Sequence, residues 1–88
     1  MRIRWTPAAA ADLQSINDYL KAHHPSYREP TLRKLVSAVY SLSKLPRRGR
    51  RGREEGTREL VFSPAPFVAV YRVREKSIEV IRVYHASQ

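Results

Sequence analysis

The second half of the chain alternates short apolar runs with turn-forming residues. Three runs rich in β-branched and aromatic residues cover 57–62, 67–73 and 77–85. They are separated by a Ser-Pro-Ala-Pro break at 63–66 and by a charged corner at 74–76. β-Branched and aromatic side chains favour strands, whereas proline and charged residues favour turns. The pattern therefore predicts a three-stranded antiparallel meander.

The charges indicate one register for the last two of these strands. If Glu75 and Lys76 form a two-residue corner, Arg72 lies opposite Glu79 as a favourable pair of opposite charges, and a shift by one residue removes that pair. The same register predicts three further pairs, which are Tyr71 with Val80, Val70 with Ile81, and Val68 with Val83.

Both faces of the meander are largely apolar in this register. One face would carry Val68, Val70, Arg72, Glu79, Ile81, Val83 and His85, and the other Phe67, Ala69, Tyr71, Val73, Ile78, Val80, Arg82 and Tyr84. Two helices can bury only one such face, and monomers seldom expose an apolar patch of several hundred Å². We therefore expect a partner on the second face, unless the sheet coils tightly enough to bury both.

The first half predicts a short strand and a helix. Residues 2–5 alternate, with Ile3 and Trp5 on the face opposite to the arginines, as in an edge strand. Thr6 followed by Pro7 predicts a helix N-cap, and His24 before Pro25 predicts the helix end. The apolar stripe of this helix is expected to be Ala9, Leu13, Ile16 and Leu20, with Asp12 turned outward.

A second helix is expected to start at Pro30 and to end before Pro46. Its apolar face is predicted to comprise Leu32, Leu35, Val36, Val39, Leu42 and Leu45. The short connection favours an antiparallel αα-hairpin, which would cover one face of the sheet.

Composition narrows the class of protein. A chain of 88 residues with 42% hydrophobic content makes one domain, residues 1–88. The absence of cysteine excludes a disulfide framework and a cysteine-based zinc site. No apolar run approaches the roughly 20 residues of a membrane span, and the N-terminus does not resemble a signal peptide. We therefore expect a cytoplasmic protein without a membrane partner.

The strongest compositional signal is a net charge of +9, with a pI near 10.7. Such a charge favours polyanionic partners, whether nucleic acid, an acidic membrane surface or an acidic protein. Much of it lies in a glycine-containing segment that is predicted to be an irregular, solvated loop. The arginines of this segment are Arg47, Arg48, Arg50, Arg51 and Arg53. Because guanidinium groups fit phosphate and carboxylate alike, this loop is either an inert charged loop or a site for a phosphate or acidic partner.

Neither a cofactor nor a metal is expected. The arginine segment lacks the GxxxxGK[ST] order of a nucleotide-binding P-loop. His23 and His24 are adjacent, so on a helix they point about 100° apart, and no acidic residue or cysteine lies at ligand spacing.

Several segments, in order along the whole chain, resemble the RelE/ParE superfamily of type II toxins. They are MRIRWTPAAAADL, a helical hairpin ending in Leu-Pro, GTRELVF, FVAVYRV and IRVYHASQ. The resemblance implies an α+β fold in the order β-α-α-β-β-β, with the αα-hairpin packed on a small, mainly antiparallel twisted sheet. It also implies the toxin of a toxin–antitoxin pair.

A cognate antitoxin is therefore the expected partner. It should be a small protein whose acidic C-terminal segment wraps around the toxin, placing apolar anchors on the sheet or in a helix groove and carboxylates near the arginines. The expected apolar contacts are Leu60, Phe62, Phe67 and Tyr84.

The two branches of the superfamily imply different targets. Members that cleave mRNA on the ribosome use a base, arginines around the phosphate and a C-terminal acid, without metal. His85 matches that acid, and Arg58 and Arg82 could supply charge, but Val68 stands where a catalytic arginine is often found. The resemblance thus favours a ParE-like inhibitor of DNA gyrase that is not an enzyme. A ribosome-dependent mRNA endoribonuclease is the alternative, and a basic nucleic-acid-binding module is a third possibility.

Overall fold

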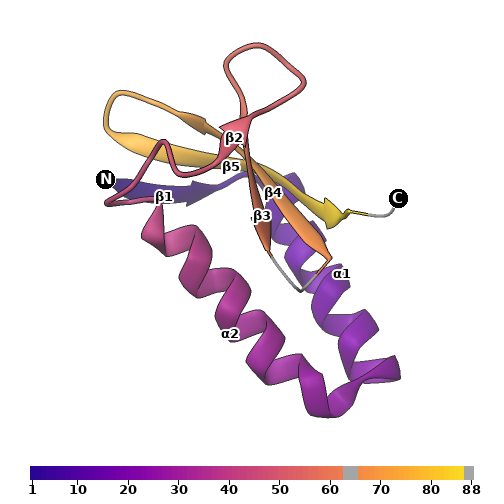
Figure 1. Cartoon of the computed structure of the whole chain (residues 1–88). Coiled ribbons are helices and arrows are strands. Elements are labelled where there is room, and N and C mark those ends of the chain that lie inside the picture. The colour runs from indigo at the N-terminus through magenta and orange to yellow at the C-terminus, as the bar shows by residue number, and fades with distance from the viewer. Residues whose placement is uncertain (63–65, 87–88) are drawn as a thin grey trace.

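The computed structural model describes residues 1–62 and 66–86, and their strands and helices confirm the predicted α+β class (Figure 1). The elements are β1 (Arg2–Trp5), α1 (Pro7–His23), α2 (Pro25–Ser41), β2 (Arg50–Arg51), β3 (Arg58–Phe62), β4 (Phe67–Val73) and β5 (Ser77–His85). The strands form one sheet in the order β1-β5-β4-β3-β2. Among the described strands, only β1 and β5 pair in parallel, and the predicted meander is β3-β4-β5. Most of the predicted break at 63–66 lies outside the described residues.

Both helices lie on the same face of the sheet and form the core with it (Figure 1). The start of α1 is as predicted, because the Thr6 hydroxyl accepts a hydrogen bond from the Ala9 N–H at 3.0 Å and proline takes the first helical position. The buried residues of α1 belong to the predicted stripe, namely Ala9, Ile16 and Leu20. Neither helix of the described chain is both long and apolar enough to cross a bilayer.

The predicted start of α2 was wrong. The helix begins at Pro25, directly after α1, and Pro30 lies inside it. Pro30 lacks an N–H, so only the Ser26 carbonyl in the exposed first turn loses its helical partner. Leu35 and Val39 are buried as predicted, but Leu45 is 59% exposed because the helix ends at Ser41.

The sequence predicted an irregular loop for the whole arginine segment, and this was wrong for two of its residues. Arg50 and Arg51 form β2, which pairs antiparallel with β3. The turn between α2 and β2 is attached to the core by Tyr71, whose side chain is fully buried. The Tyr71 hydroxyl donates to the Pro46 carbonyl and accepts from the Gly49 N–H, both at 2.8 Å. Burial raises the pKa of Tyr71, so the hydroxyl keeps its proton.

The predicted β4–β5 register holds only near the corner. Arg72 lies opposite Glu79 and Tyr71 opposite Val80, as predicted. A β-bulge then shifts the pairing, so the two predicted pairs of Val70 with Ile81 and Val68 with Val83 were wrong. Val70 instead lies opposite Arg82, and Val68 lies opposite Tyr84.

Residues of α1 and its N-cap account for the bulge. β1 ends at Trp5, and the next residue, Thr6, continues the hydrogen bonding to β5. The Thr6 N–H donates to the Val80 carbonyl (3.0 Å), and its hydroxyl donates to the Ile81 carbonyl (2.8 Å). Asp12, which was expected to face solvent, accepts the Val83 N–H at 2.9 Å. Its carboxylate also accepts two hydrogen bonds from Arg82, at 2.7 and 2.9 Å.

The bulge changes which residues share a face of the sheet. Val83 joins the core with the helices, where it is 2% exposed, and Tyr84 lies on the opposite face with Val68. Val68 is buried, but Val61 beside it is 46% exposed, and Ile81 is half-buried. The face without helices is therefore only partly covered.

Replacing Asp12 by asparagine is expected to destabilise the protein by about 1 kcal/mol at neutral pH, because charge-assisted hydrogen bonds that solvent partly screens are lost. The Arg82 guanidinium holds the pKa of Asp12 below its usual value of 3.8. A carboxyl whose pKa is lower in the folded state stabilises the fold above its unfolded pKa, and this stabilisation is lost as the pH falls through the folded pKa. Urea unfolding at pH 7 and near pH 3 should therefore show a smaller difference between wild type and Asp12→Asn at low pH.

Asp18→Asn is the matched control, since in the described chain the exposed Asp18 accepts hydrogen bonds only from Gln14 and Asn17 of the same helix. Equal losses of stability in the two variants would show that Asp12 does not hold β5.

Candidate functional site

A groove of about 590 Å³ runs between α2 and the free edge of β3. Its lining residues are Tyr27, Pro30, Thr31, Lys34, Leu35, Ala38, Arg48, Leu60, Val61, Phe62 and Phe67. We call this the α2–β3 groove. Aromatic and aliphatic side chains form most of its surface, which is the composition of sites that take apolar anchors of a partner.

The edge of β3 along this groove has unused hydrogen-bonding capacity. The Thr57 carbonyl accepts the Gly52 N–H at 2.8 Å across this edge, and alternate residues of an antiparallel strand point to the same neighbour. Glu59 therefore faces β2, and Val61 faces the same side. Because β2 is only two residues long, no described strand lies beside Val61. Its backbone N–H and C=O are thus available to an extended chain.

Two cationic side chains, Lys34 from α2 and Arg48 from the turn before β2, line the groove together with its apolar residues. Lys34 has no ion-pair partner among the described residues, and Arg48 donates to the Ser41 hydroxyl at 2.6 Å. No carboxylate of a described residue lines the groove. The groove therefore combines apolar pockets with an uncompensated positive charge, which favours an acidic occupant.

Three of the four predicted partner contacts meet in this groove. Leu60, Phe62 and Phe67 line it while remaining more than nine-tenths buried. Tyr84 is not part of it, and lies instead on the sheet face opposite the helices, beside Ile81 and Arg82.

The contribution of α2 to the groove was missed in the sequence. Tyr27, Thr31, Lys34 and Ala38 lie at spacings of four, three and four residues, which places them on one face of a helix. That spacing was a usable signal, but it was hidden because the helix was expected to start only at Pro30.

The three candidate catalytic residues of a ribonuclease are not brought together. Arg58 lies opposite Tyr71, and its guanidinium donates to the carbonyls of Gly49 (2.7 Å) and Arg47 (3.3 Å). Arg82 is bound to Asp12 on the other edge of the meander. His85 contacts the Phe67 ring edge-on, with ring centroids 5.6 Å apart.

The five loop arginines divide among different surroundings. Arg48 lines the α2–β3 groove, and Arg50 forms an ion pair with Glu59 at 2.9 Å. Arg47 and Arg51 line a second hollow together with Arg58, and Arg53 lines a third hollow with Tyr84. The loop is therefore not one uniform basic surface.

His23 and His24 lie at the tip of the helical hairpin. Their rings contact Tyr19, at centroid distances of 4.7 and 6.0 Å, and His24 also lies 6.4 Å from Tyr27. In the described part of the chain, no three histidine or acidic residues come together in a way that could hold a metal ion.

Comparison with known proteins identifies the relatives of the chain. The family described as ParE toxin of type II toxin-antitoxin system, parDE, matches residues 3–88. Toxin Y4kP of Sinorhizobium fredii is 36% identical over 87 residues, which are 99% of this chain and 90% of that protein. Toxin RelE2 of Caulobacter vibrioides is 34% identical over 87 residues, covering 99% and 97% of the two chains.

Solved structures agree with the family match. The chromosomal ParDE system from P. aeruginosa contains a chain with a TM-score of 0.87 and 31% identity, with 97% of this chain and 95% of that chain covered. A chain of the RelBE2 toxin–antitoxin complex from Mycobacterium tuberculosis has a TM-score of 0.69 and 24% identity, covering 96% and 95%, and so shares the fold.

Proposed function

Because this chain belongs to the ParE toxin family of type II toxin–antitoxin systems, we propose that it acts by binding and inhibiting DNA gyrase rather than by cleaving RNA. The observation that carries the proposal is the separation of Arg58, Arg82 and His85. A general acid must lie within hydrogen-bond reach of the group it protonates, and the charges that stabilise a phosphate must surround that same phosphate.

The geometry of the sheet gives the size of this separation. The partners of Arg58 and His85 on β4 are Tyr71 and Phe67, four residues apart, which corresponds to roughly 13 Å along the strand. Arg82 lies opposite Val70, and its Nε and Nη2 donate to the two carboxylate oxygens of Asp12. Arg82 is therefore used to hold the fold, and it lies apart from Arg58 and His85, which supports a toxin that works by binding.

The α2–β3 groove is the surface we assign to the antitoxin. Its apolar lining fits alternating side chains of an extended segment, and the free backbone groups of Val61 can pair with that segment. Lys34 and Arg48 then meet the carboxylates of an acidic partner. A segment that orders on binding would lose conformational entropy, and the apolar area buried in the groove would offset this cost.

The proposed target is tested by a gyrase supercoiling assay with purified, folded toxin. Wild-type toxin should inhibit supercoiling at micromolar concentration, and addition of the antitoxin should restore it. His85→Ala should inhibit as wild type does, since His85 has no catalytic role in this proposal. Folded toxin without effect on gyrase would contradict the proposal, and so would mRNA cleavage on the ribosome that is abolished by His85→Ala.

A further inference from the structure

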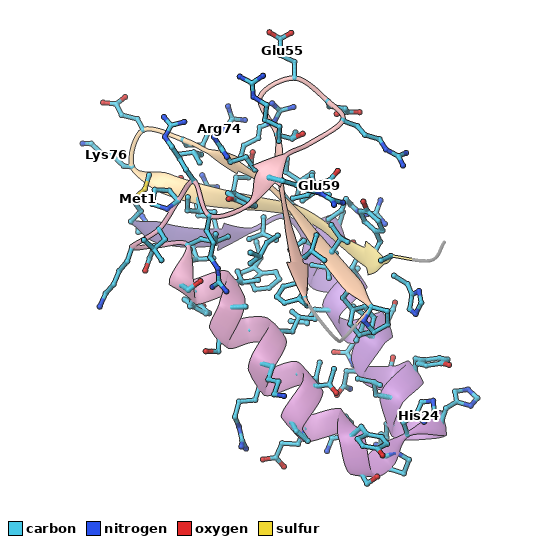
Figure 2. The ribbon with its side chains drawn as sticks, in the orientation of Figure 1. Met1, His24, Glu55, Glu59, Arg74 and Lys76 are labelled. Carbon is cyan, nitrogen blue, oxygen red and sulfur yellow. The ribbon has the colours of Figure 1, made fainter. Side chains whose placement is uncertain are left out.

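The hairpin between β2 and β3 projects from the sheet, and Glu55 lies at its outer end (Figures 1 and 2). Short-range contacts fix its shape. The Gly52 N–H donates to the Thr57 carbonyl at 2.8 Å, and the Thr57 hydroxyl donates to the Glu54 carbonyl at 2.6 Å. Gly56 has a φ of 80°, which an L side chain rarely adopts. These contacts stabilise the observed conformation of a glycine-containing, charged loop.

This conformation places three arginines around one hollow of about 490 Å³, which we call the arginine hollow. Arg58 comes from β3, Arg51 from β2 and Arg47 from the turn before β2. Arg58 is held in place by the carbonyls of Gly49 and Arg47. The side chains of Arg47 and Arg51 have no hydrogen-bond or ion-pair partner among the described residues. Two free guanidinium groups therefore lie beside one that is already oriented.

Two carboxylates, Glu54 and Glu55, also line the arginine hollow. They reduce its positive charge, and they would repel a ligand carboxylate or phosphate equally. Replacing the two glutamates should strengthen the binding of any anion in the hollow, whereas replacing the arginines should weaken it. The two kinds of variant are therefore expected to have opposite effects on affinity.

We propose that the arginine hollow binds the phosphodiester backbone of nucleic acid. Guanidinium groups bind phosphate oxygens in pairs, and three of them from separate segments can surround one phosphate. The net charge of +9 attracts a polyanion over long range. An acidic protein segment already has a matching surface in the α2–β3 groove, which shares no lining residue with the arginine hollow. In the cell, the bound nucleic acid would be the DNA held by gyrase, and this part of the proposal rests on the proposed function. Binding of free duplex DNA does not depend on the proposed function.

Fluorescence anisotropy with a labelled 20-base-pair DNA duplex, between about 50 and 200 mM salt, tests this site. Arg47→Gln combined with Arg51→Gln should weaken binding about tenfold or more, and the slope of log affinity against log salt should become shallower by roughly two. Glu54→Gln combined with Glu55→Gln should tighten binding. The matched control is Lys21→Gln with Lys44→Gln, which removes the same charge from exposed positions outside the hollow.

The proposal is supported if only the hollow variants change the affinity and the slope. It is overturned if wild type does not bind duplex DNA, or if the control variant loses as much as the arginine variant. The same titration with an RNA duplex of the same sequence shows whether the hollow prefers the phosphodiester backbone of DNA or that of RNA. Normal gyrase inhibition by toxin that fails to bind DNA would overturn the site and leave the proposed function intact. Arginine-dependent DNA binding without gyrase inhibition would support the site and overturn the proposed function.

Discussion

Toxin carrying Lys34→Glu together with Arg48→Glu is expected to bind its antitoxin about 100-fold more weakly than wild type, which corresponds to about 2.7 kcal/mol. Both side chains line the α2–β3 groove, and none of the described residues places a carboxylate in it. Reversing them places two negative charges against an acidic segment in a partly desolvated groove, where like-charge contacts cost several kcal/mol. Titration calorimetry with the antitoxin measures the change directly.

The reversed side chains are both exposed, so the variant should remain folded and inhibit gyrase, while no longer being neutralised. Lys21→Glu with Lys44→Glu changes the net charge equally at exposed positions that do not line the groove. This control should lose only a fewfold in affinity at physiological salt, because separated surface charges are screened. If both double variants weaken binding to the same extent, the effect comes from net charge and the groove is not the antitoxin site.

Gly49→Ala is expected to destabilise the protein by about 3 kcal/mol. A Cβ at Gly49 would lie 2.7 Å from two atoms of the Tyr71 ring and hydroxyl and 2.8 Å from the Glu59 carbonyl oxygen. Tyr71 cannot move away, because it is fully buried and its hydroxyl is bound to Pro46 and Gly49. Thermal unfolding should show a midpoint lower by more than about 10 °C in a domain of this size.

Gly56→Ala is the comparison for this prediction. Its Cβ would meet only the Arg72 guanidinium, the flexible end of a side chain, although its positive φ is unfavourable for alanine. We expect a cost of about 1 kcal/mol. Equal stability of Gly49→Ala and wild type would mean that the turn before β2 is not packed against Tyr71 as described.

Local signals were sufficient for most of the fold. The Thr6-Pro7 cap, the apolar stripe of α1 and the Arg72–Glu79 pair each involve residues close in sequence, and all three are confirmed. The start of α2 was misplaced because two prolines compete as first helical residues, and Pro25 directly after α1 is also compatible with a helix start. The two-residue strand β2 has no sequence signal, since it forms only by pairing with β3.

The bulge in β5 could not be predicted from its own sequence. It depends on Asp12, which lies 70 residues before Arg82 and looks like an ordinary solvent-facing position of an amphipathic helix. For the same reason, only some residues of the α2–β3 groove could be predicted from the sequence. Leu60, Phe62 and Phe67 were visible as apolar strand residues, whereas the facing side chains of α2 required the correct helix start and the packing of α2 on β3.

We propose that this toxin inhibits DNA gyrase by holding it on cleaved DNA and does not cut RNA. Both outcomes can be measured in one culture of cells that express the toxin. After induction, gyrase–DNA cleavage complexes and primer-extension products of translated mRNA would be measured together. The account predicts accumulation of cleavage complexes, suppressed by co-expressed antitoxin and unchanged in His85→Ala, with no new mRNA ends. New mRNA ends that depend on His85, without cleavage complexes, would contradict it.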